Sequence, residues 1–290
     1  MADSLTGQCT TAETAVVLMT VYGQERAERL DDSLDSIVNQ TRLPQKIVLV
    51  KDGPLTESMD EVIDRYASAH PDLFEIVRLT QNNGRVYALN SGLQHCNSEY
   101  TFIMDSDDLS LPDRFEKQLQ FMEIHPDIGV LSSAMYEFSQ DPGNPDRIKT
   151  VVADHEAIMK QFPWRNPINN PACCYRTELV REVGGYPDLR YLEDYYLWSK
   201  LLCRGTRFHN LTEPLLLFRF NRATLTRRRG WVNFRNECWL RWFLYQNGQS
   251  TLAVVLLAML LQLLLRFAPV GLQNVLWKTT RQRTSVVLKP

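Results

Sequence analysis

Four short apolar runs recur along the first part of the chain, and their spacing constrains the fold more than any other feature of the sequence. They are AVVLMT at 15–20, KIVLV at 46–50, FEIVRL at 74–79 and YTFIM at 100–104. Nearly continuous apolar runs of this length are typical of strands that are buried on both faces of a sheet. The sequence therefore predicts a strand at each of these four places.

Segments with helical periodicity separate these runs. Apolar residues recur three and four positions apart after the first and second runs, and Pro112 begins a similar pattern after the fourth. The residues that carry the patterns are Leu30, Leu34, Ile37, Val38, Met59, Val62, Ile63, Tyr66, Phe115, Leu119 and Met122. Strands that alternate with helices predict parallel βαβ units, and hence an α/β fold whose mostly parallel central sheet is flanked by helices.

Polar residues follow every predicted strand, as TVYGQE, KDGP, QNNGR and DSDD. Turn chemistry alone accounts for KDGP or NNG taken singly. In open α/β sheets, however, ligands bind beyond the carboxyl ends of the strands. Together the four exits predict a crevice lined by Asp52, Arg85, Asp105 and Asp107, suited to a ligand with a base, a sugar and a diphosphate. Because clustered carboxylates repel one another and hard cations prefer their oxygens, we expect Mn²⁺ or Mg²⁺ there.

The composition indicates a globular chain with free thiols. Of 290 residues, 44% are hydrophobic and 23% charged, and the six cysteines form no CxxC pair. The polar start MADSLTGQCTTAET does not resemble a secretory signal, so a reducing cytosol is expected. Adjacent Cys173 and Cys174 are expected to be buried on opposite faces of a strand. Neither GxxxxGK[ST] nor GxGxxG occurs, which argues against P-loop and dinucleotide-binding enzymes.

Charge is divided unevenly along the chain. Residues 201–290 contain 14 Lys and Arg against two acids, a net +12, whereas residues 1–200 contain 18 against 32, a net −14. The run LAVVLLAMLLQLLL at 252–265 is shorter than the ~20 residues that span a bilayer, and aromatic and basic residues flank it. This pattern predicts an element lying in an anionic membrane interface. The alternative is a helical hairpin that packs on the rest of the protein or forms a dimer contact.

Several segments in a fixed order carry a resemblance to a known family. They are VVLMTVYGQE, SLDSIVNQTRLPQKIVLVKDGP, NNGRVYALNSGL, YTFIMDSDDLSLPDR, NPINNPACCYRTELVREVGGYPDLRYLEDYYLW and RRRG. From about Val16 to Arg229 the sequence resembles family 2 glycosyltransferases of the GT-A fold, in particular bacterial polysaccharide and O-antigen enzymes of the amylovoran-biosynthesis type. The expected organisation is a flexible N-terminus at 1–14, a GT-A catalytic domain at 15–229 and a helical extension at 230–290.

The resemblance implies roles for the donor side of the site. Thr20, Tyr22, Glu25 and Asp52 would hold the base and ribose, with a UDP-sugar favoured. The DSD segment looks like the DXD motif of the family, in which Asp105 would face the ribose or metal-bound water and Asp107 would bind the cation. Asp108 is expected to cap the following turn instead. Arg227, Arg228 and Arg229 would either close over the diphosphate or form a solvated basic loop.

The segment YLEDYYLW at 191–198 has two interpretations. Glu193 and Asp194 are typical of the start of a helix, where acids suit the helix dipole. The resemblance implies instead that Asp194 is the general base of an inverting transfer and that Glu193 holds sugar hydroxyls. Many relatives have His in place of Asn170, and some have a ligating His after the final strand; neither place holds His here. His209 is interpreted as structural.

The resulting prediction is a metal-dependent, inverting glycosyltransferase that builds bacterial surface polysaccharide at the cytoplasmic face of the membrane. The expected partners are a nucleotide-sugar donor, a polyprenyl-diphosphate-linked sugar acceptor and the membrane surface, but no nucleic acid; a homo-oligomer is left open. Two alternatives remain. FIMDSDD also matches part of a haloacid-dehalogenase phosphohydrolase motif, although Leu109 occupies its fifth place, and a non-enzymatic membrane adaptor would account for the C-terminal extension alone.

Overall fold

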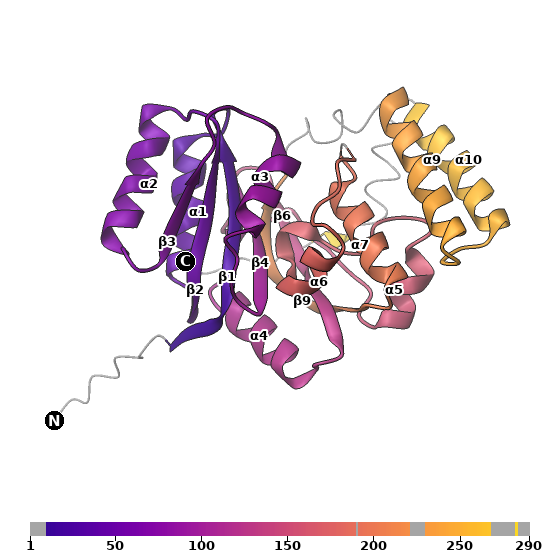
Figure 1. Cartoon of the computed structure of the whole chain (residues 1–290), viewed down its shortest axis with the longest axis horizontal. Helices are drawn as coiled ribbons and strands as arrows, with labels where there is room; N and C mark the ends of the chain where they lie inside the picture. Colours follow the sequence, from indigo (N-terminus) through magenta and orange to yellow (C-terminus); the bar gives the residue numbers. More distant parts are fainter. Residues whose placement is uncertain (1–9, 190, 221–229, 268–281, 284–290) are drawn as a thin grey trace.

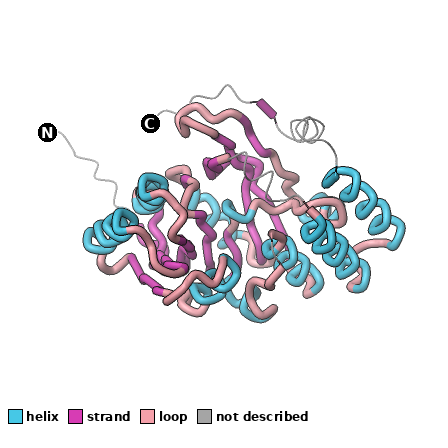
Figure 2. Tube along the Cα trace, turned by 90° about the horizontal axis from the view of Figure 1, so that it is seen from above, coloured by secondary structure: helices cyan, strands magenta, loops and turns pink. Residues whose placement is uncertain are grey.

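The computed structural model describes residues 10–189, 191–220, 230–267 and 282–283. One mixed sheet runs through the middle of the molecule, with helices on both sides (Figures 1 and 2). The strands are β1 Thr10–Tyr22, β2 Arg42–Asp52, β3 Phe74–Arg78, β4 Tyr100–Asp105, β5 Leu109–Ser110, β6 Ile128–Phe138, β7 Arg147–Lys149, β8 Cys174–Arg176, β9 Arg207–Arg219 and β10 Gln282–Arg283. The helices are α1 Ala27–Val38, α2 Glu57–Ala69, α3 Arg85–Leu93, α4 Arg114–Ile124, α5 His155–Gln161, the 3₁₀ helix η1 Asn170–Ala172, α6 Thr177–Glu182, α7 Glu193–Cys203, α9 Trp231–Gln246 and α10 Leu252–Phe267.

The four strands predicted from the apolar runs form the parallel half of the sheet. Strand β1 pairs in parallel with β2 and β4, and β2 pairs in parallel with β3. The predicted α/β fold of parallel strands with flanking helices is therefore confirmed. Beyond β4 the sheet continues through β8 and β6, which pair antiparallel, and β9 lies parallel to β6.

Alternate residues of the central strands belong to two separate cores, one on each face of the sheet. Val16 and Leu18 face the core that includes α3 and α7, while Val17 and Met19 face the core beneath α1, α2 and α4. This alternation follows from the two-residue repeat of a strand. Cys173 belongs to the first core and Cys174 to the second, and both are free thiols, so the expectation of burial on opposite faces is confirmed.

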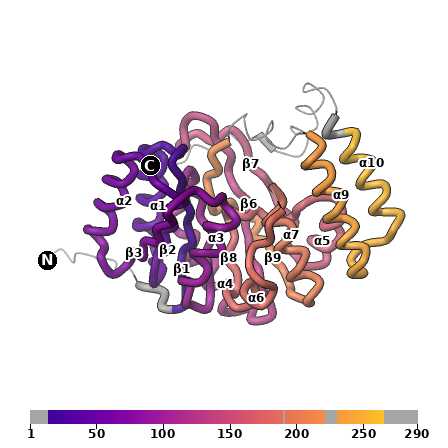
Figure 3. The backbone as a smooth tube through the Cα atoms, turned by 45° about the horizontal axis from the view of Figure 1, so that its top comes forward, coloured from indigo at the N-terminus to yellow at the C-terminus, as the bar shows by residue number. Residues whose placement is uncertain are grey.

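Helices α9 and α10 form a hairpin at one end of the molecule, with α9 on the side of α7 (Figures 1 and 3). Leu240 and Leu244 of α9 are completely buried in the same core as α7. The ring of Tyr196 meets Trp239 edge-on at 4.7 Å and Phe243 at 5.1 Å, measured between ring centroids. The inner side of the hairpin therefore packs on the rest of the protein, against α7.

The outer side of the hairpin is strongly apolar. Seven leucines of α10 are exposed, at positions 252, 256, 257, 260, 261, 263 and 264. Trp231 and Trp242 of α9 are exposed as well. Among the helices that the structure describes, none combines the length and apolar character needed to cross a membrane.

Candidate active site

The carboxyl ends of β1, β2 and β4 bring the first predicted site residues together. In the ladder, Thr20 of β1 lies opposite Asp105 of β4, and Tyr22 lies opposite Asp52 of β2. Because neighbouring strands are about 5 Å apart, these residues lie at one edge of the sheet. Tyr22 is 37% exposed and Asp52 only 4%. The predicted crevice residues therefore converge, and their nucleotide-binding roles stay a prediction.

Asp52 organises the loop between β3 and α3. Its two carboxylate oxygens accept the backbone N–H groups of Asn83 at 2.8 Å and Gly84 at 3.0 Å. The next residue, Gly53, has a φ of 85°, and a Cβ there would lie 2.5 Å from the backbone nitrogen of Asn82. Only glycine allows this approach without strain. KDGP and NNG are thus two halves of one contact, which fixes the start of α3 at Arg85.

Arg85 connects the acids after β4 with the start of α7. Its guanidinium lies 2.6 Å from Oδ1 of Asp105 and 3.7 Å from Oε1 of Glu193. These two carboxylates raise the pKa of Arg85, Asp105 having the larger effect. The Arg85 side chain remains 39% exposed, so its charge is within reach of a ligand. Two sequence motifs that are far apart in the chain therefore belong to one site.

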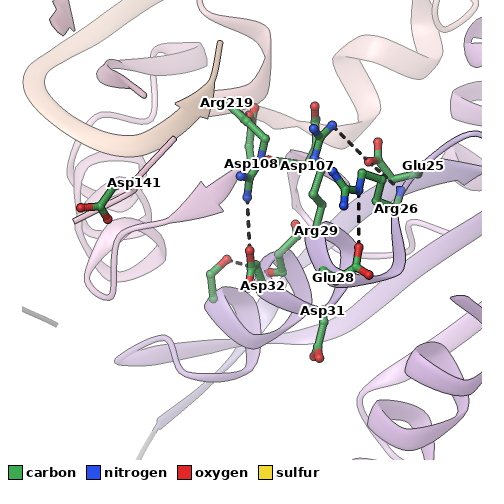
Figure 4. A network of polar contacts seen from close by, with 12 residues as sticks. Glu25, Arg26, Glu28, Arg29, Asp31, Asp32, Asp107, Asp108, Asp141 and Arg219 are labelled. Atoms are coloured by element: carbon green, nitrogen blue, oxygen red, sulfur yellow. Dashed lines mark hydrogen bonds and ion pairs between the residues drawn. The ribbon is translucent and has the colours of Figure 1, made fainter. Parts of the chain in front are cut away.

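Asp107 lies close to two other acidic side chains, those of Asp105 and Glu25. Partial burial, followed by the charges of Asp105 and Glu25, raises the pKa of Asp107 to about 6, although Arg29 and Arg85 oppose the effect. Glu25 also lies 3.7 Å from Arg29 at the start of α1 (Figure 4). No hydrogen bond from another described residue reaches the Asp107 carboxylate. An under-compensated carboxylate of this kind fits a hard divalent cation.

A ready-made metal centre of three protein ligands is absent from the described part of the chain. Mg²⁺ is commonly held by one or two carboxylates together with phosphate oxygens and water, and the carboxylates of Asp107 and Asp105 could supply such a pair. The donor set fits the expected Mn²⁺ or Mg²⁺, and the assignment of these two residues as ligands stays a prediction.

Asp108 does not cap the turn that follows it, and that expectation is wrong. Its side chain is completely buried, and Oδ1 accepts the backbone N–H of Arg219 at 2.8 Å. Burial, together with the charges of Asp107 and Asp105, raises the pKa of Asp108. The side chain turns inward because β9 offers a backbone donor there. Asp108 thus fastens the DSDD segment to β9.

Arg219 reinforces the same connection, and the sequence analysis missed it. Its Nε donates to the backbone oxygen of Asp107 at 2.9 Å, and Nη2 pairs with Asp32 of α1 at 3.2 Å (Figure 4). The guanidinium lies over the ring of Phe138, 4.7 Å from its centroid. The signal in the sequence was a lone cation within the apolar run LLLFRF, where a charge must find a partner.

Arg114 supports the strand end from behind and was also missed. Its guanidinium is completely buried and donates to the backbone oxygen of Ile103 at 2.9 Å, to Ser110 at 3.0 Å and to Gln118 at 3.0 Å. Burial lowers the pKa of Arg114 to about 10. Arg114 therefore ties β4, β5 and α4 together beneath the DSDD segment.

Glu193 and Asp194 occupy the first turn of α7, so the helix-start interpretation describes their location correctly. Oδ2 of Asp194 accepts the side-chain amide of Asn166 at 2.9 Å, and Oδ1 accepts the N–H of Tyr195 at 2.8 Å. Burial and then the Asp194 charge raise the pKa of Glu193, whereas Arg85 opposes the effect. The two carboxylates thus interact with each other, and Glu193 faces Arg85. Asn166, in the NPINNP segment, is a further residue that the sequence analysis did not single out.

Three further places were named from the sequence: the arginines at 227–229, His209 and Asn170. Arg227, Arg228 and Arg229 fall outside the described residues. His209 stacks on Phe121 at a centroid distance of 4.5 Å, in agreement with its structural interpretation. Asn170 is 7% exposed and lies in η1.

The sequence profile described as Glycosyl transferase family 2 matches residues 16–184. The chain belongs to this family. It is 35% identical to an uncharacterized glycosyltransferase of Haemophilus influenzae over 91% of this chain and 97% of that protein. It is 33% identical to the amylovoran biosynthesis glycosyltransferase AmsE of Erwinia amylovora over 92% and 98% of the two chains. It is 30% identical to UDP-Gal:alpha-D-GlcNAc-diphosphoundecaprenol beta-1,3-galactosyltransferase of Escherichia coli over 92% and 96%.

Solved structures share the fold. TarS from S. aureus matches with a TM-score of 0.63 at 16% identity over 92% of this chain and 48% of that chain. A complex of TarS 1-349 with UDP-GlcNAc matches with a TM-score of 0.61 at 17% identity over 78% and 65% of the two chains. The mannosyltransferase PcManGT from Pyrobaculum calidifontis, in complex with GDP-Man and Mn²⁺, gives 0.54 at 18% over 92% and 79%. At these identities the likeness concerns the fold alone.

The family membership decides between the functional classes considered from the sequence. The predicted family is confirmed, and transferase activity follows from it. The phosphohydrolase and adaptor alternatives lose their support, because the DSDD segment lies after the fourth strand of a glycosyltransferase fold.

Proposed function

We propose that this chain transfers a sugar, with inversion at the anomeric carbon, from a UDP-sugar to a lipid-linked glycan during bacterial surface polysaccharide synthesis. The E. coli relative is named for a UDP-Gal donor and a diphosphoundecaprenol acceptor, and the TarS complex contains UDP-GlcNAc. PcManGT is bound to GDP-Man, so the fold also accepts another base. Asp52 favours uracil if one of its oxygens, besides accepting the N–H of Asn83 or Gly84, accepts a further hydrogen bond from the imide N–H of the base.

On the donor side, Thr20, Tyr22, Glu25 and Asp52 bind the nucleoside, and the charge of Arg85 faces the diphosphate. A divalent cation, when held by Asp107 and Asp105, supplies neutralisation of the charge on the departing diphosphate. The Mn²⁺ in the PcManGT complex supports this assignment. We assign Arg227, Arg228 and Arg229 to binding of the diphosphate on the sequence pattern alone.

On the acceptor side, Asp194 is the general base. It takes the proton of the acceptor hydroxyl while the oxygen of that hydroxyl bonds to the anomeric carbon. The bond from this carbon to the diphosphate oxygen breaks on the opposite face, and its electron pair leaves with the nucleoside diphosphate. One displacement of this kind inverts the configuration without a covalent intermediate. Glu193 holds sugar hydroxyls beside it.

The observation that carries the proposal is the position of Arg85. It lies 2.6 Å from Asp105 of the donor side and 3.7 Å from Glu193, the neighbour of the proposed base. A cation between two acidic groups attracts both and so holds them within one site. The proposed donor and acceptor residues are therefore neighbours, joined through Arg85.

The test combines binding and turnover. A panel of nucleotide sugars is titrated by calorimetry with and without Mn²⁺, and transfer to a diphospholipid-linked sugar is followed in parallel. Asp107→Asn should lower transfer by about 100-fold or more at saturating Mn²⁺ with an unchanged fold. Asp194→Asn should bind nucleotide and metal normally yet fail in transfer, because an amide accepts no proton. Full activity of either variant, or of the wild type in excess EDTA, would contradict the corresponding role.

The outer side of the hairpin supports a peripheral position on the inner face of the cytoplasmic membrane. Leu256, Leu260 and Leu264 project from one face of α10 at four-residue spacing and are 57%, 52% and 60% exposed. A helix of this length, lying flat, buries such a face at the boundary of headgroups and acyl chains. The net +12 of residues 201–290 adds attraction to anionic lipid. This location suits a lipid-linked acceptor.

Flotation with vesicles of graded anionic content, at low and high salt, tests the membrane proposal. The full chain should bind more strongly as anionic lipid increases, and salt should weaken binding. Replacing Leu256, Leu260 and Leu264 by Gln should abolish it, whereas the control Ile124→Gln, at an exposed apolar site on α4, should not. A chain that ignores anionic vesicles leaves a dimer contact as the explanation. A chain that only detergent extracts is inserted rather than interfacial.

A further inference from the structure

Asn166 holds Asp194 from a loop whose conformation determines the contact. The amide of Asn166 donates to Oδ2 of Asp194 at 2.9 Å, and its oxygen accepts the backbone N–H of Ile168 at 3.0 Å. Because the Ile168 N–H requires the amide oxygen, the NH₂ group must face Asp194. The path of the loop around Asn166 therefore sets where the donor to the proposed base lies.

Arg241 of α9 is hydrogen-bonded to this loop at Trp164, two residues before Asn166. Its Nη2 donates to the backbone oxygen of Trp164 at 3.0 Å, and Nη1 donates to the backbone oxygen of Glu237 at 3.1 Å and to the Glu237 carboxylate. Arg241 is 1% and Glu237 6% exposed. A buried ion pair contributes little net stability but holds a fixed geometry, because neither charge can leave its partner. The Trp164 carbonyl is thus attached to the hairpin.

The same pair lies close to the residue that follows Asp194. Burial raises the pKa of Tyr195, Arg241 opposes the rise, and Glu237 and Asp194 add to it. The Tyr195 hydroxyl donates to the backbone oxygen of Phe162, just before Trp164. The hairpin, the loop and the first turn of α7 therefore form one packed unit around the proposed base.

We infer that Arg241 is a positioning residue for sugar transfer, which fixes the loop at Trp164 so that Asn166 holds Asp194 in place. This inference rests on the proposed role of Asp194 as the base. The N–H of Asn166 stabilises the ionised carboxylate and orients its other lone pairs. The C-terminal hairpin is therefore part of the catalytic unit as well as a candidate membrane contact.

The pH dependence of kcat tests this arrangement, because a general base must be ionised to act. Among the described residues, the charged and titratable groups that interact with Asp194 include Glu193, Tyr195, Tyr186, Cys173 and, through Glu193, Arg85. All of them stay unchanged in the variants below. The acidic limb of kcat belongs to the interacting pair of Glu193 and Asp194, and a shift of the limb between variants reports a change at that pair.

The experiment compares Asn166→Ala, the paired variant Arg241→Met with Glu237→Gln, and their combination in the full chain. The pair is neutralised together so that no buried charge is left alone. Asn166→Ala should lower kcat about 10-fold and move the acidic limb upward by about one pH unit, with the KM for the donor unchanged. The paired variant should change both in the same direction but less. The combination should equal Asn166→Ala alone, because both act along one path.

A matched control is Leu244→Ala, which removes buried α9 contacts but leaves the Arg241 contact with Trp164. It should lower Tm without moving the acidic limb. If the paired variant unfolds, Arg241→Lys keeps the charge, loses the forked donor and should shift the limb in the same direction. Fold-changes that multiply in the combination, an unmoved limb in the Arg241 variants, or an equal shift in Leu244→Ala would each overturn the inference.

Failure of the inference and failure of the proposed base are distinguishable. Full turnover by Asp194→Asn would show that Asp194 is not the general base. An inactive Asp194→Asn beside Arg241 variants with wild-type profiles removes only the positioning role.

Discussion

Asp107→Asn should stabilise the metal-free protein at neutral pH, although it destroys the proposed metal site. The pKa of Asp107 is raised from 3.8 to about 6 by burial and by the charges of Asp105 and Glu25. A carboxyl whose pKa is higher in the folded state binds its proton more tightly there, so its ionisation destabilises the fold. Each pKa unit corresponds to about 1.4 kcal/mol, so the penalty above pH 6 is at most about 3 kcal/mol. Allowing for relaxation of the partly exposed site, we expect about 1–3 kcal/mol.

The sign of this effect depends on pH and on ligand. In EDTA the gain from Asp107→Asn should be complete above about pH 6, should shrink as the pH falls and should vanish below about pH 4, where the carboxyl is protonated in both states. With Mn²⁺ and UDP at 100 times their Kd, the wild type gains about 2.7 kcal/mol from binding and the variant does not. The order of stabilities should then reverse wherever the variant's gain in EDTA is smaller than about 2.7 kcal/mol.

Chemical denaturation at pH 4.5, 6 and 8, in EDTA and in Mn²⁺ with UDP, measures the free energy of unfolding. Differences of about 1 kcal/mol are large enough to be detected in this way. Glu61→Gln, at an exposed acid on α2, is the matched control and should leave stability unchanged in all conditions. A variant that is less stable than the wild type at pH 8 in EDTA would refute the reasoning, because the carboxylate would then make a stabilising contact. Equal stabilisation of both proteins by Mn²⁺ with UDP would refute the metal role.

Three further predictions concern the loops and arginines around the site. Gly53→Ala should cost about 2–4 kcal/mol in chemical denaturation, against about 1 kcal/mol for Gly205→Ala, because both have positive φ but only Gly53 meets a backbone atom. Arg85→Gln should lower kcat/KM by about 10- to 100-fold and move the acidic limb upward, as loss of a charged hydrogen bond costs about 1.5–3 kcal/mol; an unmoved limb would count against its contact with the acids. Arg219→Met should raise the Mn²⁺ concentration for half activation by about 10-fold or more, while UDP binding without metal, measured by calorimetry, stays the same.

The sequence predicted the parallel half of the sheet because its strands are buried on both faces and read as apolar runs. The strands extend beyond the runs, as β2 does through Lys51 and Asp52, where polar residues continue the ladder and then enter the site. The antiparallel half was not predicted. Strand β8 has three residues, too few for a pattern, and β6 contains the buried Ser132 and Ser133, which interrupt its apolar run. Ser132 is tolerated because its hydroxyl donates to the backbone oxygen of Asn169 at 2.9 Å.

The acids of the candidate site were predicted because several of them lie within one short segment. Their supports were not, because each support acts across the fold. Arg219 reaches the DSDD segment from the end of β9, and Asn166 reaches Asp194 from the loop after α5. Asp108 was misassigned for the same reason: a local pattern favours a turn cap, whereas the donor that captures the side chain comes from a distant strand.

Arg85, Arg219 and Arg241 each help to position the acidic residues of the candidate site, but they differ in exposure. The side chain of Arg85 is 39% exposed, that of Arg219 14% and that of Arg241 1%. A charge that solvent reaches is also within reach of a diphosphate, so Arg85 alone among the three combines contact with the acids and access to a ligand. The guanidinium of Arg219 donates to the backbone oxygen of Asp107 and to the carboxylate of Asp32 on α1. That of Arg241 donates to the backbone oxygen of Trp164 and to the carboxylate of Glu237 on its own helix. The single ammonium group of a lysine does not reproduce this forked geometry. The DSDD segment is thus fastened to β9 and α1, and the loop beside the proposed base is fastened to α9. Different elements therefore hold the two halves of the site, and Arg85 joins them through its contacts with Asp105 and Glu193.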